Sequence, residues 1–510
     1  MKVFLMYQDC DFDLQQQLPS HEKALTQDLE LNTLFNAMAR GNEFLFEVAK
    51  KALLSGLNDP DAILYRQKIL QDCLKNPSLT RDIYNIAVEA MEEQKKHYYG
   101  FFSYYPSSIL YNAVEIMQIL AGMLKRIKNI ADEHAGKFES EGFTRFFAMV
   151  EKELDAEYFA RIQNHLRELK FRDGLLISAE LGKGNEGTHY ILRKPHDKKQ
   201  SWLERIFAKK PPVYAFSISD RDESGARALT ELKNRGINLV ANALAQSADH
   251  MRSFFDALRT ELAFYVGCLN LSEYLAQIGE PISFPLPVAS HERKHSFTGL
   301  YDVCLALTMK EKVVGNDVNA HSKDLVMITG ANQGGKSTFL RSIGLAQLMM
   351  QCGMFVPAQS FCANICAGLF THYKREEDAT MKSGKLDEEL SRMSGIVDNI
   401  TPNSLILFNE SFAATNEREG SEIARQIVGA LLEKRIKVFF VTHLSQLAHG
   451  FYEKKMENAI FLWAERQTDG GRTFKLIVGE PLQTSYGEDL YHRVFGRDNL
   501  NETDHEIYST

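Results

Sequence analysis

A glycine-rich turn between an apolar run and a helical pattern is the feature that most constrains the fold of this chain. The turn, residues 330–337, reads GANQGGKS and satisfies G-x-x-x-x-G-K-[ST] at every fixed position. Residues 325–328 before it are all apolar and predict a buried strand. The residues after it are apolar at helical spacing: Phe339, Leu340, Ile343, Leu345, Leu348 and Met349. This order predicts a strand, a tight turn and a helix.

A turn of this kind binds phosphate groups. Its glycines, Gly330, Gly334 and Gly335, let backbone N–H groups close around phosphate oxygens, and the helix N-terminus adds a favourable dipole. Lys336 is expected to reach the β and γ phosphates of a nucleotide, and Ser337 to bind Mg²⁺ through its hydroxyl. A chance glycine-rich turn is the alternative, and the flanking strand and helix make it the poorer interpretation.

Two further apolar runs end in polar residues. Residues 405–408 lead into Asn409 and Glu410, and residues 437–441 lead into Thr442 and His443. In an open parallel sheet the carboxyl ends of the strands meet at one edge, where ligands bind. Glu410 is therefore the candidate to orient and activate an attacking water, because phosphoryl transfer mainly needs positioning and charge stabilisation.

His443 is the candidate to hydrogen-bond the γ-phosphate. A histidine at a strand end is more often structural. Here it is the third polar group expected at the same edge of one sheet, and this convergence favours the functional interpretation.

The first half of the chain is predicted to be helical, with one β-hairpin. We expect a strand at residues 3–7, then helices, one of which starts at Pro106. Residues 175–179 and 188–192 flank a glycine-rich turn and predict the hairpin. Residues 222–278 show a long helical stripe that Gly236 is expected to bend or break.

These patterns predict a mixed fold in four segments. Residues 1–20 form a lead-in, and residues 21–283 an all-α core and lever domain with the hairpin and a basic connector at 171–212. Residues 284–490 form an α/β P-loop domain with a parallel sheet, and residues 491–510 a tail. Three prolines between positions 281 and 287 mark the main boundary.

Net charge limits how the protein could bind nucleic acid. A formal charge of −8 excludes a protein that coats nucleic acid, so any DNA contact must come from a local basic patch. The best candidate is the basic connector, for which a solvated linker is an equally good interpretation: Arg193, Lys194, Lys198, Lys199, Arg205, Lys209 and Lys210.

Cysteine usage and hydropathy bear on the location of the protein. Seven cysteines, without a metal-ligand spacing, are typical of reduced thiols in a cytoplasmic protein. The first residues lack a signal-peptide pattern, and no uninterrupted run approaches the ~18 apolar residues that span a bilayer, so no membrane partner is expected.

Four segments resemble the ATPase domain of the MutS family of DNA mismatch-repair proteins: GANQGGKST at 330–338, FVPA at 355–358, NESFAATNEREG at 409–420 and THLSQLA at 442–448. Asn332 and Thr338 complete the match to the family's P-loop. Residues 57–77 resemble, more weakly, the start of the family's helical core. The resemblance implies an ABC-type ATPase that uses ATP and Mg²⁺, a homodimer whose nucleotide sites are completed by the partner subunit, and clamp-like movement on duplex DNA.

The sequence departs from the family pattern in four places. The helical core starts near residue 20, which leaves no room for a mismatch-reading domain before it. The Walker B aspartate is Asn409, which can bind a Mg²⁺-bound water but carries no charge. The signature read by the partner's ATP is unclear, and Ser383 is its nearest candidate. The C-terminal dimerisation extension is short or missing.

We therefore expect a cytoplasmic MutS-like ATPase that couples Mg²⁺-dependent ATP hydrolysis to engagement of double-stranded or branched DNA without mismatch recognition. The alternative is an ATP-dependent regulatory protein that acts on a protein partner. The net charge and the missing reading domain favour this alternative, whereas the family resemblance and the basic connector favour DNA. A small-molecule kinase is disfavoured by His443 and by the long helical half.

Overall fold

The structure, a computed structural model, describes residues 1–98, 105–172, 174–194, 214–375, 384–467 and 471–482. Its residues group into two compact units, which we treat separately. The helical unit comprises Met1–Phe4, Ser78–Glu139 and Phe143–Leu262. The P-loop unit comprises Leu5–Pro77, Ser140–Gly142 and Ala263–Thr510.

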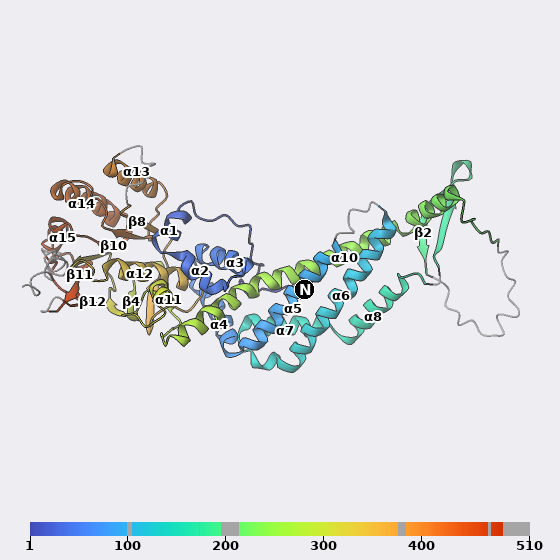
Figure 1. The fold of residues 1–510 in the computed structure, drawn as a ribbon, viewed down its shortest axis with the longest axis horizontal. Coiled ribbons are helices and arrows are strands. Elements are labelled where there is room, and N and C mark those ends of the chain that lie inside the picture. Colours follow the sequence, from blue (N-terminus) through green and yellow to red (C-terminus); the bar gives the residue numbers. More distant parts are fainter. Residues whose placement is uncertain (99–104, 173, 195–213, 376–383, 468–470, 483–510) are drawn as a thin grey trace, which may run out of the picture. The chain divides into compact units, whose positions relative to one another are not determined.

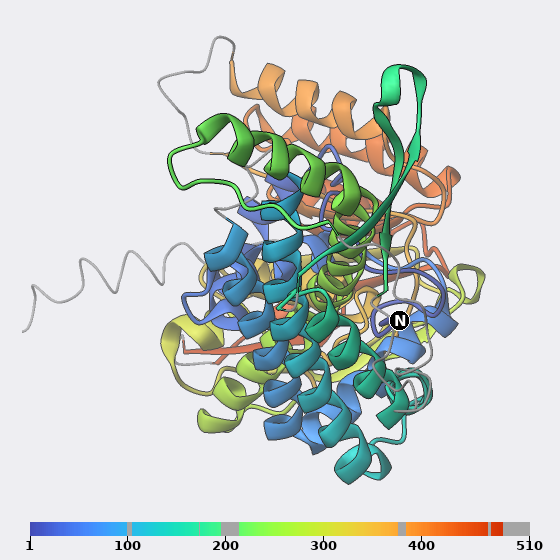
Figure 2. The same cartoon turned by 90° about the vertical axis from the view of Figure 1, so that its right-hand side faces the viewer.

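Long helices make up most of the helical unit (Figures 1 and 2). Helix α6 begins at Pro106, as the sequence predicts. The backbone N–H of Ser107 donates to Asn234 Oδ1 of α10 at 3.2 Å, and the ring of Phe146 in α7 stacks on that of Phe254 in α10. The elements are α5 (Pro77–Tyr98), α6 (Pro106–His134), η1 (Ala135–Lys137), α7 (Glu141–Glu153), α8 (Ala156–Glu168) and α10 (Glu223–Gln277).

The predicted hairpin is present, and it explains the glycine in α10. Strands β1 (Leu176–Leu181) and β2 (Gly187–Arg193) pair antiparallel across the short helix η2 (Lys183–Asn185). Helix α10 runs unbroken for 55 residues, so Gly236 does not break it. A Cβ at position 236 would lie 2.5 Å from Ile177 Cδ1 of β1. The glycine therefore lets the hairpin approach the helix closely.

One helical segment bears on the expectation from hydropathy. Residues Pro106–Lys137 are long and apolar enough, by length and composition only, to cross a membrane. Polar residues interrupt the segment, so it contains no long uninterrupted apolar run. A single such helix is weak evidence for a membrane span, since the core helix of a soluble protein passes the same test. Several apolar residues of α6 are indeed buried in the helical unit, among them Leu110, Val114, Leu120 and Leu124.

A six-stranded sheet forms the centre of the P-loop unit, in the order β12-β11-β6-β10-β9-β8. All neighbouring strands are parallel except the antiparallel edge pair β11 and β12. The expected parallel sheet is thus present in five of these six strands, and β12 adds an antiparallel edge. The strands are β6 (Leu325–Gly330), β8 (Leu369–Tyr373), β9 (Leu405–Asn409), β10 (Lys437–Val441), β11 (Ala459–Arg466) and β12 (Arg472–Val478).

Helices cover both faces of this sheet, which explains why its central strands are apolar throughout (Figure 1). Leu325 and Met327 of β6 belong to a core cluster with residues of α13, α14 and α15. Their neighbours in β6 point to the opposite face, and α12 contacts β9 and β10. The helices are α11 (Val303–Met309), α12 (Lys336–Gln351), α13 (Lys385–Val397), α14 (Glu417–Glu433) and α15 (Ser445–Tyr452).

A second, four-stranded sheet in the same unit was not predicted. Its order is β3-β7-β4-β5, and its strands are short and only partly apolar. Such strands lack the alternation or the apolar run by which a strand is recognised in a sequence. The elements are β3 (Leu286–Val288), η3 (Ser290–Glu292), β4 (His295–Leu300), β5 (Asn316–Asn319) and β7 (Ser360–Asn364).

Residues 5–77 pack within the P-loop unit without adding a described strand to its sheets. The expected strand at residues 3–7 is absent from the structure. The Met6 carbonyl instead accepts hydrogen bonds from Nε and Nη2 of the fully buried Arg66, whose Nη1 donates to the Cys352 carbonyl at 3.0 Å. Arg66 thereby ties the first residues to the C-terminal end of α12. The helices here are α1 (Glu22–Asp28), α2 (Leu31–Ala39), α3 (Glu43–Leu54) and α4 (Pro60–Lys75).

Candidate nucleotide-binding site

The glycine-rich turn has the local geometry that its sequence predicts. It joins β6 to α12, which begins at Lys336. Gly330 and Gly335 have φ values of +106° and +83°, in the region that favours glycine. A Cβ on Gly334 would lie 2.7 Å from the Cβ of Ala464 in β11. The turn can therefore adopt this conformation only with glycine at these positions.

Lys336 is buried at the start of α12 and points back into the turn. Its Nζ donates to the carbonyls of Gly330 at 3.0 Å and Ala331 at 2.8 Å. Burial lowers the pKa of Lys336 to about 8, although the negative charge of Glu410 opposes this shift. An anion placed beside this ammonium would be strongly attracted to it, because few water molecules screen the charge.

The register of the sheet brings the three predicted strand ends together. Strand β10 lies between β6 and β9, and Val441 pairs with Ile328 on one side and Asn409 on the other. The residues after these strands therefore share one edge. There His443 Nε2 donates to Glu410 Oε1 at 2.8 Å, and the two side chains are 29% and 32% exposed. The sequence predicted this convergence but not the direct bond.

The bond to His443 is the main reason that the pKa of Glu410 is lowered, and burial opposes this effect. Glu410 is therefore ionised at neutral pH. A neutral imidazole has only one N–H, so a His443 that donates to Glu410 through Nε2 cannot also donate to a phosphate through Nδ1. To bond both groups, the ring must carry two protons. His443 thus has a second possible task, which is to hold Glu410.

The loop that carries Glu410 has an unusual backbone. Glu410 and Phe412 both have left-handed φ values, +54° and +63°. Residues other than glycine pay roughly 1–2 kcal/mol for this conformation, so the surrounding structure must hold them in it. One such restraint is the N–H of Glu410, which donates to the Val441 carbonyl at 2.9 Å.

The two predicted Mg²⁺ ligands lie next to each other. Ser337 Oγ donates to Asn409 Oδ1 at 2.9 Å, so two neutral oxygen atoms converge between the P-loop and β9. This donor set fits Mg²⁺, which usually takes one or two protein oxygens and completes its shell with water and phosphate oxygens. No group of three His, Cys, Asp or Glu residues that could hold another metal occurs within the described ranges. All seven cysteines are free.

A cavity of about 260 Å³ adjoins the turn, and no sequence pattern predicts it. Gly335 and Thr338 form the wall that it shares with the P-loop, and Val313, Val314 and Phe474 provide apolar surface. Nearby, Arg472 Nε donates to the Asn332 carbonyl at 3.2 Å. These residues come from three distant segments, so only the folded chain brings them together.

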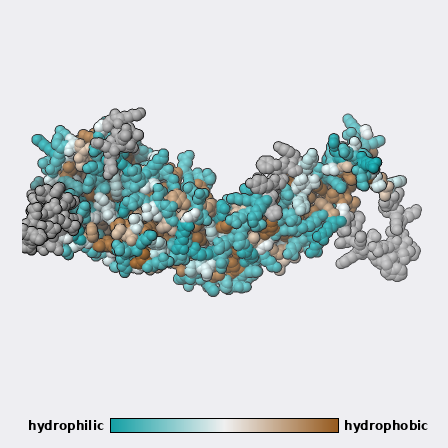
Figure 3. All heavy atoms as spheres, in the orientation of Figure 1, coloured by the Kyte–Doolittle hydropathy of each residue, from teal (hydrophilic) through white to brown (hydrophobic). Residues whose placement is uncertain are grey.

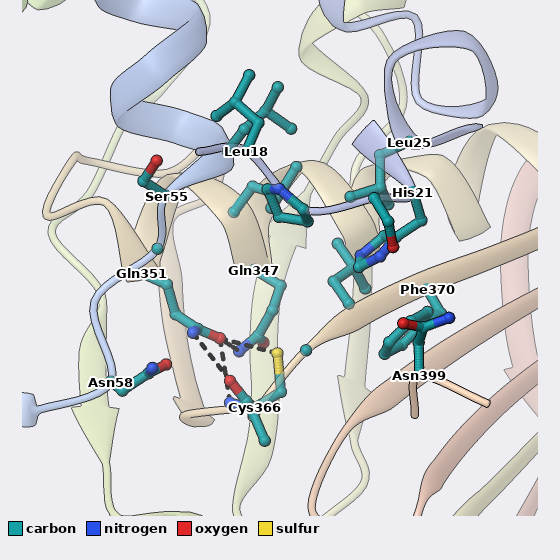
Figure 4. A pocket seen from close by; sticks show the side chains of 18 of the residues that line it. Leu18, His21, Leu25, Ser55, Asn58, Gln347, Gln351, Cys366, Phe370 and Asn399 are labelled. Carbon is teal, nitrogen blue, oxygen red and sulfur yellow. Dashed lines mark hydrogen bonds between the residues drawn. The ribbon is translucent and has the colours of Figure 1, made fainter. Parts of the chain in front are cut away.

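A larger cavity of about 580 Å³ lies elsewhere in the P-loop unit, near the C-terminal end of α12 (Figure 4). Its wall contains no lysine or arginine. One of its carboxamides is engaged with the protein: Gln351 Oε1 accepts from the Cys366 N–H at 3.0 Å. A cavity without cations is a poor phosphate site, so its volume does not make it the nucleotide site.

Other predicted site residues are only partly described. Ser383, Lys198, Lys199, Arg205, Lys209 and Lys210 lie outside the described residues. Arg193 Nε donates to Ser178 Oγ at 2.9 Å within the hairpin, and Lys194 Nζ pairs with a carboxylate oxygen of Glu168 at 2.9 Å. The side chains of Arg193 and Lys194 are exposed on the surface. In the sequence, both residues lie far from the P-loop.

Fold and site together define a P-loop protein with a phosphate-binding turn at the carboxyl edge of a largely parallel sheet. Two family models match the chain: the MutS2 N-terminal domain over residues 58–278 and MutS domain V over residues 326–494. The chain belongs to the MutS family.

Relatives with curated names agree. The chain is 26% identical to the DNA mismatch repair protein MutS of Chlamydia trachomatis serovar D over 299 residues, or 50% of this chain and 36% of that protein. It is 34% identical to the same-named protein of Thermotoga maritima over 235 residues, 44% of this chain and 29% of that protein. It is 26% identical to MutS protein homolog 4 of Mus musculus over 245 residues, 46% and 24% of the two chains. The chain therefore covers about a third or less of the length of these relatives.

Proposed function

We propose that this protein is a Mg²⁺-dependent ATPase that couples ATP binding and hydrolysis to the engagement of double-stranded or branched DNA. The observation that carries the proposal is the convergence at one sheet edge of a buried lysine, a pair of oxygen ligands and an ionised carboxylate. These are the parts that phosphoryl transfer to water requires. Residues 284–490 would form the ATPase domain, and residues 21–283 the core and lever.

ATP would bind with its triphosphate along residues 330–338. Lys336 would exchange its two carbonyl partners for phosphate oxygens, and Asn332 and the glycines would offer backbone N–H groups. The cavity beside Gly335 and Thr338 would take the nucleobase against Phe474. Bound Mg²⁺, held by Ser337 and Asn409, would neutralise charge on the phosphates.

Glu410 would orient the attacking water, and His443 would hold Glu410 or contact the γ-phosphate. A carboxylate with a lowered pKa is a weak base. This is acceptable here because the transition state of phosphoryl transfer is loose and draws little on the base. The main contribution of Glu410 is therefore the position and charge of its carboxylate.

Assembly and DNA contact are further parts of the proposal. We propose a cytoplasmic homodimer in which Ser383 of one subunit approaches the nucleotide of the other. The relatives named above are called DNA mismatch repair proteins, and this supports DNA as the partner. The contact would come from the basic connector between the hairpin and α10: Arg193, Lys194, Lys198, Lys199, Arg205, Lys209 and Lys210.

The first test measures ATP hydrolysis by the purified chain alone and with duplex, four-way junction or single-stranded DNA. Hydrolysis that Lys336→Ala abolishes and that duplex or junction changes severalfold supports the proposal. Lys434→Ala, which alters an exposed lysine at the end of α14, is the matched control. Hydrolysis that no DNA alters favours the second candidate, a regulator of a protein partner, for which the net charge of −8 speaks.

The second test concerns mismatches. Phosphate contacts from lysine and arginine carry no information about base pairing, whereas mismatch reading needs an element that exploits easier kinking. We expect this chain to bind matched and mismatched duplexes with affinities equal within about threefold, and both to fall steeply with salt. Changing Lys198, Lys199, Lys209 and Lys210 to Glu should abolish binding. A tenfold preference for the mismatch in a titration at two salt concentrations would reject this part.

A further inference from the structure

A buried polar cluster lies next to the loop that carries Glu410. It consists of His372 in β8, Glu389 in α13 and Ser411 in the loop, and each is almost fully buried. The three residues are within one unit of the protein. Buried polar side chains are costly unless they are hydrogen-bonded, so the partners of these three show what the cluster holds in place.

His372 connects the loop to α13. Its Nε2 lies 2.9 Å from the main-chain carbonyl of Glu389, which can only accept, so Nε2 carries a proton. Its Nδ1 lies 2.7 Å from Ser411 Oγ, which also lies 2.5 Å from the His372 carbonyl, so the single hydroxyl proton has two neighbouring acceptors. Burial lowers the pKa of His372 to about 4, so the ring is neutral at pH 7.

Glu389 makes a second connection, through its side chain. Its Oε2 accepts the backbone N–H of Phe412 at 2.8 Å. The Phe412 ring stacks on His372, with ring centroids 5.2 Å apart. A single residue of α13 therefore bonds to β8 through its carbonyl and to the Glu410 loop through its carboxylate.

These bonds act on the part of the loop that needs support. Glu410 and Phe412 have left-handed backbones, and Ser411 lies between them. The other side of Phe412 is also fixed, because a Cβ at Gly420 of α14 would lie 2.3 Å from the Phe412 carbonyl oxygen. Loss of the Glu389 carboxylate would release the N–H of Phe412, two residues from Glu410.

We propose that Glu389 is a positioning residue for hydrolysis: it holds residues 410–412 so that the Glu410 carboxylate meets His443 and faces the P-loop. The inference rests on the proposed ATPase function. It also links α13 to the Glu410 loop, because Glu389 bonds directly to Phe412 and reaches Ser411 through His372. Glu389 bonds to β8 and to Phe412, and we assign it no direct contact with the P-loop.

The test compares three variants with the parent protein, using kcat, the Kd for a fluorescent ATP analogue and the melting temperature. Glu389→Ala should lower kcat about tenfold and leave Kd within about twofold, since only a group in its reactive position is lost. Glu389→Gln should keep at least half of the rate, because its carboxamide oxygen can still accept from Phe412. Met393→Ala is the matched control: it is equally buried on α13 but packs only in the apolar core.

A pH profile separates positioning from simple loss of stability. In Glu389→Ala, Glu410 should lose its bond to His443, and the acid limb of kcat should move to higher pH. In Met393→Ala the acid limb of kcat should stay in place, even if the melting temperature falls as much as in Glu389→Ala. If Glu389→Ala does not fold, Ser411→Ala gives the same readout, with an expected loss of about threefold in kcat.

The outcomes distinguish failure of the positioning role from failure of the proposed ATPase function. A parent rate and an unchanged acid limb in Glu389→Ala, or in Ser411→Ala where that variant replaces it, would overturn the inference while the ATPase proposal stands, provided that Glu410→Gln is inactive. If the parent protein hydrolyses no more ATP than Lys336→Ala, the proposed function fails and this inference fails with it.

Discussion

Two glutamate–histidine pairs lie near the same edge of the central sheet, and their surroundings set them apart. Glu410 and His443 are about one-third exposed and bond side chain to side chain. Glu389 and His372 are buried and bond through a backbone carbonyl. The exposed pair lowers the pKa of its carboxyl, whereas burial raises that of Glu389 and lowers that of His372.

The difference shows how burial changes the task of the same residue types. An ionised carboxylate that is about one-third exposed can meet water and a phosphate, so it suits chemistry. A buried pair that bonds to the backbone of α13 and of Phe412 suits support, because moving it would leave polar groups unpaired. Four experiments test whether the exposed pair acts in hydrolysis and the buried pair supports the loop.

The largest effect is expected for the exposed carboxylate. Glu410→Gln should slow hydrolysis by about a hundredfold or more and leave ATP binding nearly intact, because it removes charge but little volume. Glu389→Gln makes the same chemical change in the buried pair and should cost at most twofold. Single-turnover hydrolysis and nucleotide titration measure both. Equal losses in the two variants would erase the distinction.

The buried pair should reveal itself in stability at acid pH. The pKa of His372 is about 4 in the folded protein against 6.5 as its ordinary value. Between these values the unfolded state binds more protons, so stability is lost as the pH falls from 6.5 toward 4. From pH 7 to pH 5 this loss should be about 2 kcal/mol.

Urea unfolding at pH 7 and pH 5 measures this loss, and His372→Gln provides the comparison. His295, also buried with a lowered pKa, acts in the same direction, so only the difference between parent and variant reports on His372. An identical pH dependence in the parent and in His372→Gln would show that the ring is not held neutral.

A change of the exposed histidine should affect rate and not stability. His443→Ala removes the bond that lowers the pKa of Glu410, so kcat should fall about tenfold and its acid limb should move to higher pH. The melting temperature should hardly change, since the side chain is on the surface edge. A rate profile and a thermal melt suffice. A large loss of stability with a normal rate would reverse the assignment of the two histidines.

The smallest effect is expected for Lys336, whose pKa is lowered by burial and raised by the charge of the nearby Glu410 carboxylate. Its pKa of about 8 means that the free protein loses this charge above pH 8, whereas bound phosphates would restore it. ATP affinity should therefore fall about fivefold from pH 8 to pH 9, with uptake of a proton on binding. Calorimetry in two buffers of different ionisation enthalpy measures the uptake.

Two variants test whether the pKa of Lys336 depends on the exposed glutamate and not on the buried one. Glu410→Gln removes a charge that raises the pKa of Lys336, so the loss of affinity should begin at lower pH. Glu389→Gln should leave it where it is. Lys336→Arg, which stays charged at pH 9, should show no proton uptake.

Local patterns determined the parts of this protein that depend on neighbours in the chain. The turn at 330–337 needs glycine at particular backbone angles, and the buried strands at 325, 405 and 437 need unbroken apolar runs because helices cover both faces. Sheet chirality and parallel pairing then bring Lys336, Glu410 and His443 to one edge. These features could be predicted because short-range sterics and strand direction dictate them.

Only the tertiary structure decided the features that join distant segments. The contact of Glu389 with Phe412, the cavity beside Phe474 and the packing of Arg66 against Met6 and Cys352 leave no periodic trace in the sequence. The same is true of the close approach of Gly236 to Ile177. A hydrogen bond or a cavity wall between segments far apart depends on how the elements pack, and packing is a property of the whole unit.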